Sequence, residues 1–84
     1  MDIEFTHSAR KDFEWWLKND PKKAERIEKL CKDTAKKPFN GIGKPEPLKF
    51  GLHGYWSRRI DKAHRLVYTV QEKKVVVISC RYHY

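Results

Sequence analysis

The chain has 84 residues, of which 39% are hydrophobic and 13% aromatic, so it can form one domain, spanning residues 1–84, around a single modest core. Its 19 Lys and Arg residues outnumber its 11 Asp and Glu residues, which gives a formal net charge of +8 at pH 7. This composition excludes a disordered chain and favours a polyanionic partner, most often nucleic acid, over a cationic surface that serves only solubility.

The first predicted element is a short strand at residues 2–5, where Ile3 and Phe5 alternate with acidic residues. A helix is predicted to follow within residues 6–19, and Thr6 or Ser8 can cap its start. Its apolar residues at i, i+4, i+7 and i+8 form one stripe that is expected to face the core: Ala9, Phe13, Trp16 and Leu17.

A second helix is predicted within residues 20–37. Asp20 is a suitable N-cap, Pro21 suits the first helical position, and Pro38 ends the pattern. Its buried stripe is expected to comprise Ala24, Ile27, Leu30, Cys31 and Thr34. The short turn between the two helices predicts an antiparallel helical hairpin.

Residues 38–54 contain three of the four prolines and all four glycines, which predicts a loop-rich centre. Three strand-like runs follow at residues 55–61, 64–70 and 74–84, and their short connections make them antiparallel neighbours. The order of one strand, two helices and a meander predicts an α+β domain. Both helices are expected on one face of a mainly antiparallel sheet.

Side-chain alternation then assigns residues to the two faces of the sheet. The core face is expected to carry Leu66, Tyr68, Val70, Val76, Ile78, Cys80 and Tyr82. The uncovered face is expected to carry Arg65, Val67 and Thr69 together with Val75, Val77, Ser79, Arg81 and His83. Either Arg58 or Arg59 can join that uncovered face, but not both, because they are adjacent in one strand.

Two side chains are candidates for proton transfer. The imidazole of His83 can give or take a proton at cellular pH, and a bound phosphate would favour its protonated form, although a lone terminal histidine is more often inert. Glu46 lies between Pro45 and Pro47, which hold the local backbone extended. Spacing alone gives equal weight to a general base and to a surface carboxylate paired with Lys44 or Lys49.

Several cations are candidates for gripping a phosphate and stabilising a charged transition state: Arg65, Arg59, Lys49 and Lys44. The plainer interpretation is structural ion pairing with Asp61 or Glu72. Aromatic side chains can stack on RNA bases, and they comprise Tyr84, Tyr82, Tyr55, Trp56 and Phe50, although Trp16 and Trp56 are expected in the core.

Other chemistries lack their signatures. The sequence has neither a phosphate-binding glycine loop nor a zinc-type spacing of cysteine and histidine, so we expect no metal or cofactor and acid–base chemistry instead. No apolar run approaches the roughly 18 residues that cross a membrane, and no signal peptide is recognisable. We therefore expect a cytoplasmic protein in which Cys31 and Cys80 stay reduced.

The strings "GKPEPLK", "WSRRI", "HRLVY" and "CRYHY" together resemble the YoeB/Txe toxins, a branch of the RelE/ParE toxin superfamily, and the resemblance covers essentially the whole chain. It implies a RelE-like fold and a ribosome-dependent endoribonuclease that cuts mRNA in the decoding site. It also implies a YefM-like antitoxin, dimers of the toxin, and binding to operator DNA only through the antitoxin complex.

The resemblance also implies roles for individual residues. It makes Glu46 the general base, His83 the general acid, Arg65 the cation that stabilises the transition state, and Tyr84 an aromatic that helps hold the substrate. It matches Lys49 and Arg59 to positions that contact phosphate. Apart from the resemblance, Lys44 and Arg81 are also expected to bind the substrate. Two rival interpretations are a basic module that binds RNA or the ribosome without cutting, and, ranked lower, a ParE-like inhibitor of DNA gyrase.

Overall fold

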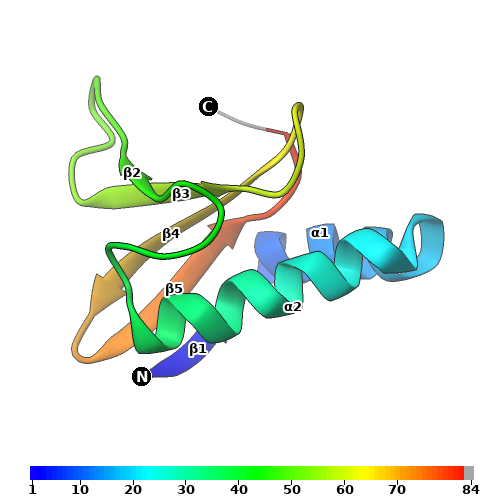
Figure 1. Cartoon of the computed structure of the whole chain (residues 1–84), viewed down its shortest axis with the longest axis horizontal. Helices are drawn as coiled ribbons and strands as arrows, with labels where there is room; N and C mark the ends of the chain where they lie inside the picture. Colours follow the sequence, from blue (N-terminus) through cyan, green and yellow to red (C-terminus); the bar gives the residue numbers. More distant parts are fainter. Residues whose placement is uncertain (83–84) are drawn as a thin grey trace.

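A computed structural model describes residues 1–82, and His83 and Tyr84 lie outside the described residues. The elements follow in the order β1 (Asp2–Phe5), α1 (His7–Asn19), α2 (Pro21–Lys36), β2 (Glu46–Pro47), β3 (Tyr55–Arg59), β4 (Arg65–Gln71) and β5 (Lys74–Ser79). Figure 1 shows the two helices running antiparallel, α2 beside α1. The predicted α+β order is confirmed. The two-residue β2 is an addition within the segment that was predicted as loop.

The strands form a mixed sheet in the order β1-β5-β4-β3-β2 within the described chain. The pairs β2–β3, β3–β4 and β4–β5 are antiparallel, as the short connections predict. β1 pairs parallel with β5, because the helical hairpin carries the chain away from β1 and the meander then brings β5 back beside it. The last strand therefore lies inside the sheet, between β1 and β4.

Local signals at the helix boundaries match the prediction except at Asp20, which occupies the N-cap position of α2 but whose side chain makes no capping hydrogen bond. The Thr6 side chain accepts a hydrogen bond from the Ala9 backbone N–H at 3.2 Å, and Pro21 occupies the first turn of α2. The stripe predicted for α2 is buried in full. In α1 the stripe is wrong at Leu17, which is 50% exposed because it lies at the edge of the stripe near the end of the helix.

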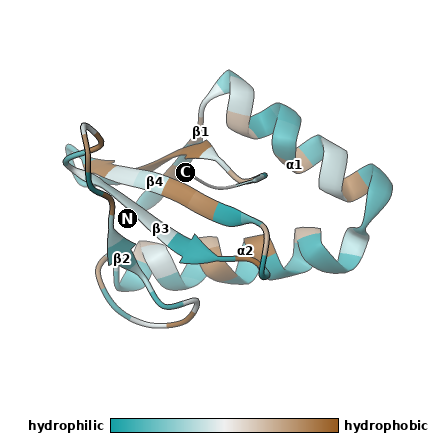
Figure 2. Cartoon of the chain, turned by 90° about the horizontal axis from the view of Figure 1, so that it is seen from above, coloured by the Kyte–Doolittle hydropathy of each residue, from teal (hydrophilic) through white to brown (hydrophobic). Residues whose placement is uncertain are grey.

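The core fills the space between the helices and one face of the sheet. Its buried members are Ala9, Trp16, Ala24, Ile27, Leu30, Cys31, Ile60, Leu66, Tyr68, Val75, Val77 and Cys80. Figure 2 shows the brown, hydrophobic segments concentrated in the central strands and alternating with teal along the helices. Burial of these side chains is the main stabilising term for a chain of this size.

The predicted face assignment was wrong for Val75, Val76 and Val77 in β5, and also for Tyr82, which was expected in the core but is 61% exposed. Val75 and Val77 are in the core, whereas Val76 pairs with Thr69 and shares the opposite face. Val67 pairs with Ser79 and the next residue, Tyr68, pairs with Val77, so Ile78 is an extra residue in the ladder. This bulge reverses the alternation and returns Cys80 to the core, where it was predicted.

The face opposite the helices is the one that concerns function. The register places Arg59 opposite Arg65 and Ser57 opposite Val67, so these side chains share that face, as does Glu46 opposite Ser57.

Within residues 1–82, no helix is both long enough and apolar enough to cross a lipid bilayer.

Candidate functional site

An ion pair between Glu46 and Arg65 forms the centre of the candidate site. Arg65 Nη1 lies 2.9 Å from Glu46 Oε1, and the two side chains are 23% and 58% exposed, respectively. The same guanidinium nitrogen lies 3.5 Å from Ser57 Oγ, at the outer limit of hydrogen bonding. A carboxylate and a guanidinium, both reachable by solvent, are thus held in contact on the face that the helices do not cover.

Strand pairing explains how residues 19 positions apart meet. Pro45 and Pro47 favour an extended backbone, and the resulting β2 adds to the edge of the sheet with Glu46 opposite Ser57. On the next strand, Ser57 pairs with Val67, two residues along β4 from Arg65. The side chain of Arg65 crosses this short diagonal to reach Glu46.

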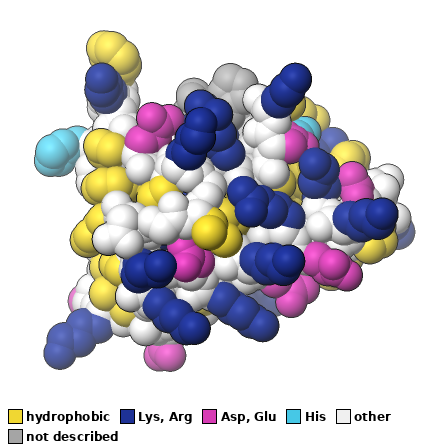
Figure 3. Space-filling model, viewed as in Figure 1, with side chains coloured by type: hydrophobic (Ala, Val, Ile, Leu, Met, Phe, Trp, Pro, Cys, Tyr) yellow, Lys and Arg dark blue, Asp and Glu magenta, His cyan; other side chains and the backbone are white. Residues whose placement is uncertain are grey.

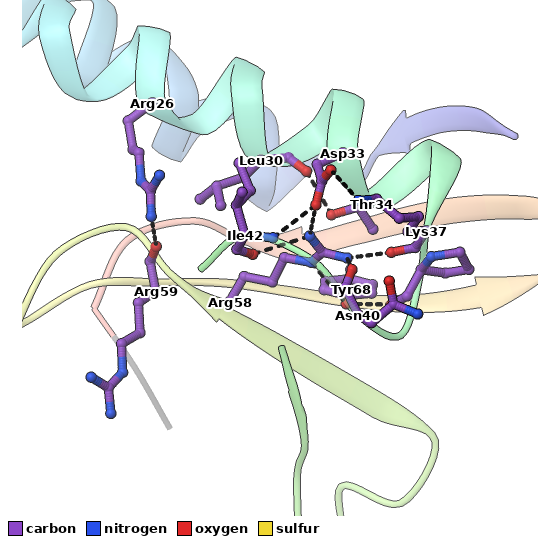
Figure 4. A network of polar contacts seen from close by, with 11 residues as sticks. Arg26, Leu30, Asp33, Thr34, Lys37, Asn40, Ile42, Arg58, Arg59 and Tyr68 are labelled. Atoms are coloured by element: carbon purple, nitrogen blue, oxygen red, sulfur yellow. Dashed lines mark hydrogen bonds and ion pairs between the residues drawn. The ribbon is translucent and has the colours of Figure 1, made fainter. Parts of the chain in front are cut away.

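The segment before Glu46 is held by the buried guanidinium of Arg58, which is 0% exposed (Figure 4). Arg58 donates to Asp33 Oδ2 at 2.7 Å and to Tyr68 Oη at 3.2 Å. It also donates to three backbone carbonyls of the segment that follows α2, namely those of Lys37, Asn40 and Ile42. The choice that the sequence left open is thereby decided: Arg58 faces the core side and Arg59 faces the site.

This network also explains the charge state of Asp33. The backbone N–H of Ile42 and then the Arg58 guanidinium donate to its carboxylate, and together they lower the pKa of Asp33 below the ordinary value. Gly41 permits the close packing here, because a Cβ at that position would meet Asp33 Oδ2 at 2.1 Å. The φ of Gly41 is also +112°, in the region that favours glycine.

The other predicted substrate-binding cations lie around the Glu46–Arg65 pair. The backbone N–H of Arg59 donates to Gly43 O at 2.7 Å, whereas its side chain is exposed and points away from Arg58 in Figure 4. Lys44 and Lys49 flank Glu46 along the chain and are exposed. A pocket of about 400 Å³ adjoins Glu46 and is lined by Glu46, Pro47, Leu48, Lys49, Phe50 and Leu52.

Exposed aromatic surface is available beside that pocket. Phe50 is 99% exposed at the tip of the β2–β3 connection, where its backbone φ is +56°. Figure 3 shows hydrophobic and basic side chains together on this projecting tip, and Lys and Arg side chains spread over the face that carries α2, with acidic side chains between them. By contrast Trp16 is in the core and Trp56 packs against it, as predicted.

Arg81 does not lie where its predicted face would put it. Its guanidinium carbon is 3.7 Å from the centre of a Trp15 ring on α1 and 4.9 Å from that of Tyr82. The expectation that Arg81 and Arg65 share one face was therefore wrong, because the chain bends after β5 and α1 supplies an aromatic partner. A substrate-binding role for Arg81 stays a prediction. The predicted acid His83 and Tyr84 fall outside the described residues.

Sequence reasoning missed the residues that hold the end of the chain. Cys80 N–H donates to Asp12 Oδ2 at 3.1 Å, and Trp16 Nε1 donates to Cys80 O at 2.7 Å. His64 Nδ1 accepts from Tyr82 N–H at 2.7 Å. No local signal in the sequence marks His64 for this contact, because it joins residues 18 positions apart.

Two further polar groups have shifted pKa values with clear causes. Burial opposes ionisation of Asp61, but the backbone N–H groups of Ala63 and His64, and then the charge of Lys23, outweigh it and lower the pKa of Asp61. Burial, and then the charge of Glu28, raises the pKa of the Cys31 thiol to about 12.

Within residues 1–82 no cluster of three or more His, Cys, Asp or Glu side chains is arranged to hold a metal ion.

Comparison with known proteins gives consistent matches. The family described as "YoeB-like toxin of bacterial type II toxin-antitoxin system" matches residues 5–84. "Toxin YoeB" of Synechocystis sp. is 54% identical over 84 residues, which cover 100% of this chain and 98% of that protein.

Solved structures agree with the sequence match. The YoeB dimer from Staphylococcus aureus is 44% identical and superposes with a TM-score of 0.92, covering 100% of this chain and 98% of that one. The heterotetrameric YoeB–YefM toxin–antitoxin complex of the same organism gives 44% identity, a TM-score of 0.90 and the same coverage. The RelBE2 complex of Mycobacterium tuberculosis, at 24% identity, a TM-score of 0.73 and coverage of 98% and 96%, supports the RelE-like fold alone.

Proposed function

The chain belongs to the family of YoeB-like toxins of bacterial type II toxin–antitoxin systems, and from this premise we propose that it is an endoribonuclease that cuts mRNA on the ribosome. The observation that carries the proposal is the 2.9 Å contact between Glu46 and Arg65 on an open face, because a carboxylate can accept a proton and a guanidinium can bind a phosphate. The net charge of +8 suits an RNA partner.

In the proposed reaction an incoming phosphodiester takes donors of Arg65 in place of the carboxylate, which leaves Glu46 free to accept a proton. Glu46 removes the proton of the ribose 2′-OH, and the 2′-oxygen forms a bond to the adjacent phosphorus. Arg65 stabilises the negative charge that develops there. The bond from phosphorus to the 5′-oxygen breaks, and His83 protonates that oxygen.

The remaining predicted residues bind and orient the RNA. Lys44, Lys49 and Arg59 are proposed to contact phosphates around the Glu46–Arg65 pair, and Tyr84 to stack on a base. Arg81 is retained as a weaker candidate, since two aromatic rings already engage its guanidinium. The reaction uses only protein side chains and requires no cofactor.

The proposed partners are the translating ribosome with its mRNA, which places the protein in the cytoplasm, and a YefM-like antitoxin. A second copy of the chain is also a proposed partner. Operator DNA is proposed to be bound only through the antitoxin complex. The proposals for the antitoxin and for self-association are supported by the S. aureus relatives, which form a YoeB–YefM heterotetramer and a YoeB dimer.

Single-turnover cleavage of a defined mRNA on purified ribosomes tests the activity. Glu46→Gln keeps the shape of the side chain but removes the base, and we expect it to slow cleavage by roughly 10²- to 10⁴-fold. Glu14→Gln, at an exposed position of α1, changes the net charge equally and should cut like the wild type. Equal rates for the two variants would refute the role of Glu46.

The same preparation separates the rival functions. A module that only binds would shift RNA in a gel without producing new ends. A gyrase inhibitor would block DNA supercoiling and leave the mRNA intact. Either result would replace the ribonuclease proposal.

A further inference from the structure

Two residues after β5, Cys80 and Tyr82, are held by the rest of the protein through their backbone. Asp12 accepts from Cys80 N–H, and Trp16 donates to Cys80 O. At Tyr82 the N–H donates to His64 Nδ1 at 2.7 Å, and the carbonyl oxygen accepts from the Arg65 N–H at 2.8 Å. We call these last two hydrogen bonds the Tyr82 anchor.

The Tyr82 anchor holds a backbone conformation that the residue would not adopt readily alone. The φ of Tyr82 is +63°, in the left-handed region, which is uncommon for a bulky aromatic residue. Such a backbone conformation persists only where several contacts with the surrounding structure hold it in place. Because Tyr82 is 61% exposed, its side chain contributes little burial, and the two backbone hydrogen bonds are the principal restraint.

His64 is itself held from three sides. Its backbone N–H donates to Asp61 Oδ1 at 2.8 Å, and Asp61 pairs with Lys23 on α2. Its ring meets the buried Trp16 ring edge-on, with centroids 4.8 Å apart, and lies 5.5 Å from the Tyr82 ring. The imidazole therefore points its Nδ1 lone pair at one backbone N–H, and this contact requires Nδ1 to be unprotonated.

The position of the anchor in the sequence links it to the reaction. His64 and Arg65 together hold Tyr82, and the side chain of the same Arg65 contacts Glu46. His83 follows Tyr82 by a single peptide bond. Two successive residues thus connect the proposed base and transition-state cation with Tyr82, the residue that precedes the proposed acid in the sequence.

We propose that His64 is a positioning residue that holds the Tyr82 backbone so that His83 can protonate the leaving oxygen, an inference that rests on the proposed ribonuclease function. It contacts no reacting atom and acts through Tyr82. A misplacement of about 1 Å in a catalytic group can cost on the order of 100-fold in rate. Loss of the Nδ1 acceptor should therefore slow the protonation step.

Two substitutions separate the acceptor from the bulk of the ring. His64→Phe keeps a flat ring against Trp16 and removes the acceptor, whereas His64→Asn offers an amide oxygen near the Nδ1 position. We expect H64F to cut ribosome-bound mRNA about 10- to 100-fold more slowly than the wild type, and H64N to recover most of that loss. If H64F does not fold, His64→Leu, which also lacks an acceptor, takes its place.

A second substrate identifies the step that is affected. In an mRNA whose scissile 5′-oxygen is replaced by sulfur, the leaving thiolate needs no proton. The defect of H64F, like that of His83→Gln, should shrink on this substrate, whereas the defect of Glu46→Gln should persist. Equal slowing of H64F on both substrates, an unimpaired H64F, or an H64N as slow as H64F would each overturn the proposal.

Amide hydrogen exchange tests the anchor apart from the reaction. Exchange at Tyr82 N–H should be about tenfold faster in H64F than in H64N, and unchanged exchange would refute the anchor itself. If His83→Gln cut the ordinary mRNA as fast as the wild type, the acid assignment would fail and the catalytic role of His64 would fail with it. The exchange result would then still report whether His64 holds Tyr82.

Discussion

Replacement of Arg58 by methionine is the sharpest test of how the segment before Glu46 is held. Methionine fills a similar length with an apolar chain but donates no hydrogen bond. The substitution would leave the carboxylate of Asp33, the hydroxyl of Tyr68 and three backbone carbonyls without their shared donor. No water can replace that donor easily, because Arg58 is 0% exposed.

The hydrogen bonds of Arg58 give a lower bound for the folding stability that this substitution would remove. The carbonyls of Lys37, Asn40 and Ile42 each lose a partner that a charged group supplied, at a cost of about 1 kcal/mol or more apiece. Arg58→Met should therefore destabilise the protein by at least about 3 kcal/mol. A domain of this length has a total stability of roughly 4–13 kcal/mol, so the loss is a large share of it.

Urea unfolding followed by tryptophan fluorescence measures the effect. With a slope of about 1.5 kcal/mol per molar urea, the midpoint should fall by about 2 M. Arg59→Met is the matched control, since its exposed side chain faces the other way and should change stability by less than about 0.5 kcal/mol. A difference between the two variants below about 1 kcal/mol would refute the role given to Arg58.

Three further predictions concern other parts of the molecule. Cys31 should react with iodoacetamide at pH 8 far more slowly in the folded than in the urea-unfolded protein, because burial raises its thiol pKa to about 12, and equally fast labelling would contradict this. The folded pKa of Asp61 lies below its ordinary value of 3.8, so its carboxylate stabilises the fold at neutral pH and this contribution is lost as pH falls from 3.8 through the folded value. The stability advantage of the wild type over Asp61→Asn, from urea unfolding at each pH, should therefore shrink below pH 3.8, and a constant difference would count against it. Phe50→Ala should leave the unfolding midpoint unchanged, because the side chain is 99% exposed, yet weaken ribosome binding by roughly 5- to 100-fold if Phe50 stacks on a base, and unaltered binding would exclude that contact.

The helices and the order of strands were predictable because their signals are local. A 3.6-residue stripe, an N-cap at Thr6 and Pro21 in a first helical turn act within a few residues of each other. The faces of β5 were not predictable from alternation, since the run from Val75 to Ile78 is apolar at every position. The bulge that decides its register depends on pairing with β4, which the strand does not encode alone.

The candidate site was predictable in part for a related reason. Glu46 is marked by its flanking prolines and Arg65 by its place in a strand, so their meeting follows once β2 and β4 are known to border β3. The contacts of Arg58 and His64 join segments that are 10 to 25 and 18 residues apart, respectively, and depend on where the chain folds back. The sequence around Arg58 and around His64 therefore gives no local signal that predicts these contacts.

The chemical identity of the cut ends tests the central claim most directly. Attack by the 2′-oxygen, with Glu46 as base and Arg65 beside it, must leave a 2′,3′-cyclic phosphate on the upstream fragment and a 5′-hydroxyl on the downstream one. The downstream fragment of ribosome-bound mRNA should therefore accept a label from polynucleotide kinase without prior phosphatase treatment. A 5′-phosphate on that fragment would mean that water, not the ribose, is the nucleophile, and the account of this site would be wrong.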